Sequence, residues 1–68
     1  MSHLSSEVKE VYVAYIKNKD GNIVRESTDY DFEHDAISWA KDTVSYYVQG
    51  TDEFYYAVIE HQVVPRYI

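Results

Sequence analysis

Residues 8–28, VKEVYVAYIKNKDGNIVREST, decide the fold because they contain two strand-like segments separated by a turn signal. Residues 8–17 are rich in β-branched and aromatic side chains, as is typical of a strand. Asp20-Gly21 follows and indicates a tight hairpin, because glycine adopts positive φ without a Cβ clash. Residues 22–28 are shorter and more polar, which suits a strand at the edge of a sheet. We therefore expect the domain to begin with a β-hairpin.

The first of these strands has apolar side chains on both of its faces. Val11, Val13 and Tyr15 alternate with Tyr12 and Ala14 along the segment. A strand with one solvated face alternates apolar with polar residues instead. We therefore expect this strand to be central in its sheet and covered on both sides.

Residues 32–48 have the three- and four-residue spacing of an amphipathic helix that packs on a sheet. We expect Asp31 to be the N-cap, with Glu33 and Asp35 in the first turn, where carboxylates favour the positive end of the helix dipole. Gly50 supplies the stop signal. The apolar stripe consists of Phe32, Ala36, Ile37, Ala40, Val44, Tyr47 and Val48.

Residues 52–64 form the most apolar segment and predict a third strand, which Pro65 ends. We expect a bulge or a bend at His61-Gln62. Together the elements predict an α+β fold of β-β-α-β order, with a three-stranded antiparallel sheet of strand order 2-1-3 and one helix packed on one face.

A single helix covers only one face of such a sheet. The other face would expose tyrosine, valine or isoleucine side chains, and large exposed apolar patches usually mark an interface. We therefore predict a homodimer whose interface is the open sheet face or a sheet edge.

The composition describes a small acidic domain. Of the 68 residues, 46% are hydrophobic and 16% aromatic, so we expect a folded domain rather than a disordered chain. We expect this single domain to comprise residues 8–68, preceded by a flexible tail of residues 1–7. Twelve Asp and Glu against six Lys and Arg give a net charge of −6, which disfavours nucleic acids and anionic membranes as partners. The longest apolar run, residues 54–59, is far shorter than the roughly 20 residues that span a bilayer. The lack of cysteine fits a cytoplasmic protein.

The sequence offers little for catalysis. It has no cysteine, no Gly-rich phosphate loop and no serine in a nucleophile-elbow context, so we expect neither an enzyme nor a cofactor. Asp29, Asp31 and Glu33 have the spacing of the start of a calcium loop, but the glycine and the distal glutamate of such a loop are missing. The three histidines show no metal-ligand spacing. We therefore assign no catalytic residue and no metal ligand.

An acidic run, residues 25–35, has two interpretations. It holds five of the twelve carboxylates and one arginine. The first interpretation is a polar connection followed by a helix start whose carboxylates favour the dipole. The second is phosphate mimicry, in which the carboxylates face a basic DNA-binding groove and a neighbouring apolar pocket supplies the affinity. The pocket would be formed by Tyr30, Ile37, Trp39, Ala40 and Val44.

A family resemblance rests on two short motifs. They are Val24-Arg25-Glu26-Ser27, a Glu-Ser pair at a strand end, and the turn Lys19-Asp20-Gly21-Asn22 before it. With the acidic helix start, they make the chain similar to small phage-encoded acidic β-β-α-β proteins. Within that group it resembles the uracil-DNA glycosylase inhibitors, which mimic DNA. The chain departs from the best-known inhibitors in having Thr28-Asp29-Tyr30 where they have an aliphatic run.

This resemblance implies a function. Glu26 would occupy an enzyme's DNA-phosphate site, Ser27 would hydrogen-bond the enzyme, and the pocket would hold one of the enzyme's apolar side chains. We therefore expect a non-enzymatic DNA mimic that inhibits a host DNA-binding enzyme, with uracil-DNA glycosylase in the host cytoplasm as the favoured target. A dimeric interaction or assembly module without mimicry, and an inhibitor of a defence nuclease, are the alternatives. The predicted partner-binding residues are Glu26, Ser27, Asp29, Tyr30, Asp31, Glu33, Asp35, Ile37, Trp39, Ala40 and Val44.

Overall fold

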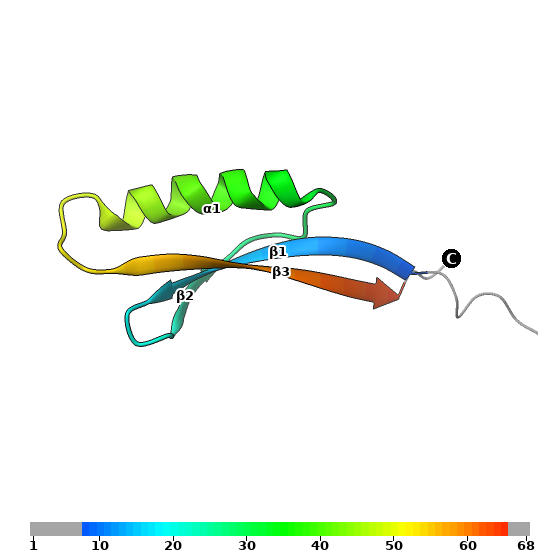
Figure 1. Ribbon diagram of the computed structural model, residues 1–68, viewed down its shortest axis with the longest axis horizontal. Helices are drawn as coiled ribbons and strands as arrows, with labels where there is room; N and C mark the ends of the chain where they lie inside the picture. Colours follow the sequence, from blue (N-terminus) through cyan, green and yellow to red (C-terminus); the bar gives the residue numbers. More distant parts are fainter. Residues whose placement is uncertain (1–7, 66–68) are drawn as a thin grey trace, which may run out of the picture.

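The computed structural model describes residues 8–65, which form a three-stranded sheet with one helix along one of its faces (Figure 1). The central strand pairs antiparallel with both of its neighbours, in the order β2-β1-β3. The predicted α+β fold, its β-β-α-β order and its antiparallel sheet are therefore confirmed. The expected tail, residues 1–7, lies outside the described residues. The elements are β1 (Val8–Asn18), β2 (Ile23–Glu26), α1 (Glu33–Val48) and β3 (Tyr55–Pro65).

The ladder between β1 and β3 is long and regular. The two strands pair residue by residue, from Val8 opposite Pro65 to Asn18 opposite Tyr55. The expected bulge at His61-Gln62 was wrong, because both residues have directly opposed partners in β1. The strand also begins later than predicted. The chain before it turns on Thr51, whose hydroxyl oxygen accepts a hydrogen bond from the Glu53 amide at 3.2 Å.

β2 is shorter than the predicted 22–28 because a side chain replaces the backbone in the ladder. The Ser27 amide donates to the Ala14 carbonyl at 2.9 Å, as in a normal strand pair. The Ala14 amide, however, donates to the Ser27 hydroxyl oxygen at 2.8 Å, and that hydroxyl donates to the Thr28 carbonyl at 2.8 Å. Regular pairing therefore stops at Glu26, and it resumes only as an isolated bridge between Tyr12 and Tyr30.

The helix begins at Glu33, with Glu33 and Asp35 in its first turn as expected. The predicted N-cap, Asp31, was wrong: Phe32 is in that position and makes no side-chain capping hydrogen bond. The Asp31 carboxylate instead forms an exposed ion pair with Lys9 at 3.2 Å. After the helix ends, Gly50 adopts a φ of 72°, the left-handed conformation that favours glycine at a helix stop.

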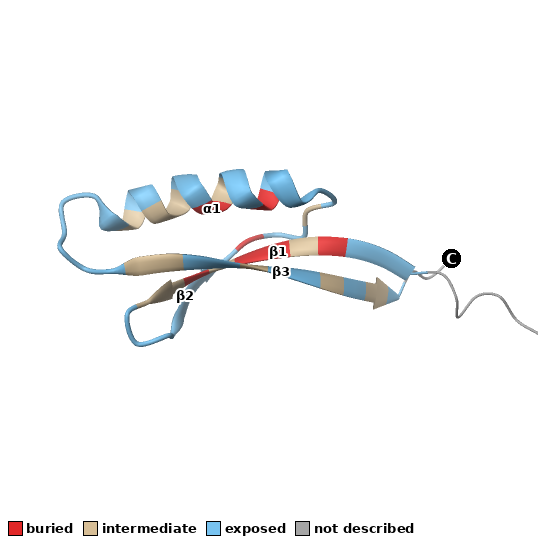
Figure 2. Cartoon of the chain, viewed as in Figure 1, coloured by how far each residue is buried: buried red, intermediate tan, exposed pale blue. Residues whose placement is uncertain are grey.

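The core forms where α1 lies on the central strand. Ala14 and Ile16 of β1 contact Ala36 and Ala40 of α1, and none of the four is more than 3% exposed. Figure 2 shows these buried residues in the middle of β1 and on the side of α1 that faces the sheet. Because three of the four are alanines, the helix can approach the sheet closely. Larger residues packed around this cluster are Tyr12, Tyr30, Trp39, Val44, Tyr47, Tyr55 and Ile59.

The face of the sheet opposite α1 carries no helix (Figure 1), yet it is not purely apolar. Val11 and Val13 are 1% and 2% exposed there, so β1 is buried on both faces as expected. Their partners in β3 are Gln62 and Glu60, whose side chains hydrogen-bond each other at 2.6 Å. Gln62 also donates to the Tyr15 hydroxyl oxygen at 3.0 Å. A polar network therefore extends across part of the face that the sequence pattern suggests is open and apolar.

Replacing Ser27 with alanine should destabilise the fold. The buried Ala14 amide would lose its acceptor, and an unsatisfied buried donor costs about 1–3 kcal/mol. In a domain of this size each kcal/mol lowers Tm by roughly 4–8 °C. The measurement is thermal and urea unfolding, with the exposed neighbour Thr28→Ala as the control, which should change the free energy of unfolding by less than about 0.5 kcal/mol. Equal stability of the two variants would contradict the role given to the Ser27 hydroxyl.

Candidate protein-interaction site

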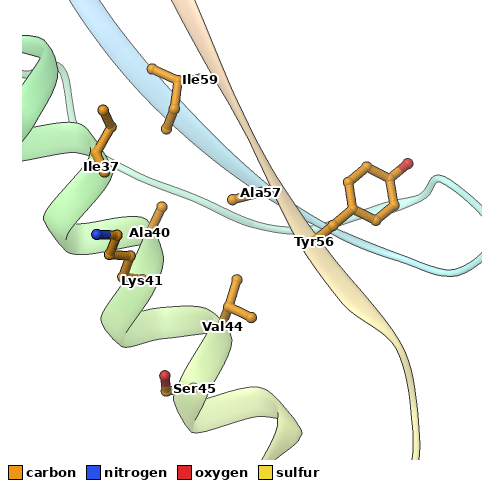
Figure 3. Close-up of a pocket in the computed structure, with 8 residues that line it drawn as sticks. All are labelled: Ile37, Ala40, Lys41, Val44, Ser45, Tyr56, Ala57 and Ile59. Carbon is orange, nitrogen blue, oxygen red and sulfur yellow. The ribbon is translucent and has the colours of Figure 1, made fainter.

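A mostly apolar cavity of about 500 Å³ lies between α1 and β3 (Figure 3). In that view Val44 and Ala40 point from the helix toward the strand, Ala57 and Ile59 point back toward the helix, and the Tyr56 ring points away. Lys41 is the single charged residue in the lining. The cavity is lined by Ile37, Ala40, Lys41, Val44, Ser45, Tyr56, Ala57 and Ile59.

The cavity follows from where small residues fall. Ile37, Lys41 and Val44 are three or four residues apart, so they share the side of α1 that faces β3. Ala40 lies beside them and packs against the sheet as part of the core cluster. On the strand, Ala57 is the small residue between larger neighbours, and its methyl group leaves the space below α1 unfilled.

Beside this cavity runs the outer edge of β3. The strand pairs with β1 on one side, and no other strand in the described part of the chain pairs with its second side. A strand in that position has outward-facing N–H and C=O groups that can pair with another chain. Natural edges are usually protected by short length, charged side chains, proline or a bulge. β3 has eleven residues in a regular register, and its Glu60 and Pro65 lie in its second half, so residues 55–59 have none of these protections. Exposed apolar side chains also lie on or next to it: Phe54 at 60%, Val58 at 38% and Val63 at 57%.

Glu26 lies far from this cavity in the fold. It belongs to β2, which is the opposite edge of the sheet, and it is directly opposite Tyr15. Tyr15 reaches Gln62 on the face away from the helix, so Glu26 is on that face as well. Ser27 is only 7% exposed, and its hydroxyl is used within the fold. The Glu-Ser pair and the cavity are therefore on opposite edges, and Ser27 has no free hydroxyl for a partner.

The other predicted carboxylates are exposed in the connection to α1 and in its first turn. Two of them have partners: Asp31 pairs with Lys9 at 3.2 Å, and Asp35 lies 3.4 Å from His34. The remaining two, Asp29 and Glu33, are exposed as well. These four carboxylates form an acidic segment, and none of them lines the cavity.

Sequence reasoning found part of the cavity. Of the five residues predicted to wall a pocket, three do line it, and Tyr30 and Trp39 instead pack against the core cluster. The three that line the cavity were identified by their helical spacing. The strand residues were missed because only the topology places them beside the helix; the signal for them was a small residue, Ala57, within a large apolar run. The lining residues found are Ile37, Ala40 and Val44, and those missed are Lys41, Ser45, Tyr56, Ala57 and Ile59.

A second cluster lies on the helix side of the sheet, where β1 and β3 extend beyond the start of α1. The His61 Nε2 atom is 2.8 Å from the Glu10 Oε1 atom, and the His61 ring stacks on Tyr12 with centroids 5.0 Å apart. Within residues 8–65 there is no group of three or more His, Cys, Asp or Glu side chains placed to hold a metal ion. No helix of the described segment is long and apolar enough to cross a membrane.

Comparisons of the chain with protein-family models, with curated proteins and with solved structures find no match.

The start of β3 carries a titratable contact. The Tyr55 hydroxyl donates to the Glu53 carboxylate at 3.0 Å, and this hydrogen bond raises the pKa of Tyr55 above its ordinary value of 10.0. Because the folded state holds the proton more tightly than the unfolded state, the contact stabilises the fold below pH 10 and loses that effect as the pH rises through the raised pKa.

Replacing Glu53 with glutamine should therefore lower the pKa of Tyr55 toward 10.0. The measurement is an NMR titration that follows the Tyr55 ring resonances between pH 8 and pH 12. Asp52→Asn is the matched control, because it removes a neighbouring carboxylate that is not among the causes of the shift. A Tyr55 pKa that moves equally in both variants, or in neither, would contradict the assigned cause.

Proposed function

We propose that this protein is a non-enzymatic protein-interaction module that binds an extended segment along the outer edge of β3. The observation that carries this proposal is the position of an apolar cavity directly beside an unprotected edge strand. A segment that adds to such an edge gains backbone hydrogen bonds, and pockets that receive alternate side chains provide specificity.

The geometry defines which side chains of the segment matter. Ala57 and Ile59 point to the helix side of the sheet, where the cavity lies. An added strand presents every second side chain to that side. One of these side chains enters the cavity, and it is apolar because the surface of the cavity is mostly apolar. Lys41 keeps its ammonium group in water at the rim while its methylene stem covers apolar surface.

The test uses peptides selected from a random display library against the immobilised protein. The strongest binder is synthesised and titrated into labelled protein, and amide shifts are mapped by NMR. We expect the largest shifts in β3 and on the β3 side of α1. Shifts confined to the acidic segment or to β2 would contradict the proposal.

A change in the cavity should weaken that binding. Ala57→Leu places a larger side chain in the cavity, so the affinity for the selected peptide should fall about tenfold or more, which corresponds to roughly 1.4 kcal/mol. Val58→Leu is the matched control, because Val58 neighbours Ala57 on the same strand but points to the other face, and it should change the affinity less than about twofold. Circular dichroism verifies that both variants are folded.

DNA mimicry is a second candidate, and the exposed acidic segment supports it. The resemblance requires a carboxylate next to a pocket, however, and in this fold Glu26 and the cavity occupy opposite edges. Inhibition of uracil-DNA glycosylase or of a defence nuclease therefore depends on the carboxylates alone. The cytoplasm as the compartment stays a prediction from the composition.

A uracil-excision assay with the purified protein titrated in separates the two candidates. We expect excision to be unchanged at large excess, because exposed charges without an adjacent pocket contribute little to affinity. Dose-dependent inhibition that is lost in Glu26→Lys and Asp29→Lys but kept in Ala57→Leu would establish mimicry instead.

A further inference from the structure

The cavity between α1 and β3 and the outer edge of β3 together form one groove. We infer that the segment that occupies this groove is β3 of a second copy of this chain. The two β3 strands pair antiparallel, so that two three-stranded sheets become one six-stranded sheet with both helices on the same face. This inference rests on the proposed function, since it requires that the β3 edge accepts an added strand.

The two edges of the sheet differ in a way that favours this arrangement. β2 has four exposed residues, it carries Arg25 and Glu26, and its regular pairing stops where the Ser27 hydroxyl replaces a backbone acceptor. Short and charged edges of this kind resist further pairing. β3 is long, regular and apolar in its first half. An antiparallel β3 pair is isologous, so one two-fold contact closes the unprotected edge of both copies and leaves only the two β2 edges outside.

The sequence of β3 selects a register for the pair. With the two-fold axis at Val58, this residue faces Val58 of the second copy, and Ala57 faces Ile59 of the second copy. A small residue is then opposite a large one, beside the cavity that Ala57 helps to form. Moving the axis to Glu60 would place two carboxylates directly opposite each other, which is destabilising.

The position of α1 fits the same arrangement. The helix contacts both β1 and β3, so it lies above the space between them. With neighbouring strands roughly 4.8 Å apart, the two helices of the six-stranded sheet would have their axes about 10 Å apart. Helices pack against each other at roughly 8–10 Å. Ile37 and Val44 would therefore meet the helix of the second copy, and the cavity of each copy would be closed from above as well as from the side.

The charge of the chain does not oppose this contact. Each copy has a net charge of −6, but residues 54–59 contain no carboxylate or ammonium group. Lys41, the single charged residue of the lining, contributes its methylene stem and keeps its ammonium group in water at the rim. Glu26 is on the β2 edge, which lies outermost in the six-stranded sheet. Repulsion between exposed charges separated by more than about 8–10 Å is largely screened at physiological ionic strength.

Light scattering coupled to size exclusion tests the inference on the full chain. We expect a mass twice the 8.0 kDa of one chain at micromolar concentration. Val58→Arg, which places two guanidinium groups together at the two-fold axis, should shift the protein to monomer, with a dissociation constant raised about tenfold or more. Ile23→Arg is the matched control: it puts the same charge at an exposed apolar position on the β2 edge and should leave the dimer intact.

A cross-linking variant provides a second, independent measurement. The chain contains no cysteine, so Val58→Cys introduces a single thiol. At the two-fold axis the two thiols lie opposite each other, and mild oxidation should convert most of the protein into a covalent dimer, whereas Ile23→Cys should cross-link only slowly.

The outcomes separate the inference from the function on which it rests. A monomer at hundreds of micromolar, or a dimer that neither Val58→Arg nor Val58→Cys affects, would overturn the inference. If that monomer still binds selected peptides at β3, the proposed function stands and the partner is another protein. If the peptides also shift only residues outside the groove, both fail.

Discussion

The close contact between α1 and β1 is the constraint on which the rest of the structure depends. Ala36 and Ala40 meet Ala14 across the interface, and these small side chains bring the helix down onto the central strand. A helix in that position covers the middle of β1, where Ala14 and Ile16 are buried, and covers β3 only in part. The cavity beside Ala57 is the part of β3 that the helix does not fill. The groove is thus a direct consequence of how closely the helix packs on the centre of the sheet.

The two edges of the sheet owe their difference to single residues. At β2, the Ser27 hydroxyl takes the place of a backbone carbonyl, so the strand cannot continue and its edge is four residues long. At the other edge, the chain turns at Gly50 and Thr51 before β3 begins at Tyr55. From there, eleven residues pair with β1 without interruption. The sheet therefore has one edge, β2, that resists further strand pairing and one edge, β3, that is open to it.

Much of the fold could be predicted from the sequence, because its signals are local. The β-branched and aromatic content of β1, the Asp-Gly turn and the helix periodicity each depend on neighbouring residues, and together they define the topology. The failures involve contacts that are distant in sequence. Asp31 is drawn to Lys9 rather than to the helix end, and the Ser27 hydroxyl binds a strand thirteen residues earlier. Local patterns cannot distinguish these partners from solvent.

The candidate site shows the same limit. Ile37, Ala40 and Val44 were found because a helical stripe is visible in sequence, but Trp39 belongs to the other flank of that helix. The strand half of the groove needs the strand order, which places β3 next to the flank with Ile37. Once that order is known, Glu26 and the apolar groove separate onto different edges of the sheet. Most of the charge in this protein is then available for solubility and long-range attraction, while the groove is mainly apolar, with Lys41 as its single charged lining residue. This division is consistent with electrostatics acting on encounter and apolar burial acting on affinity.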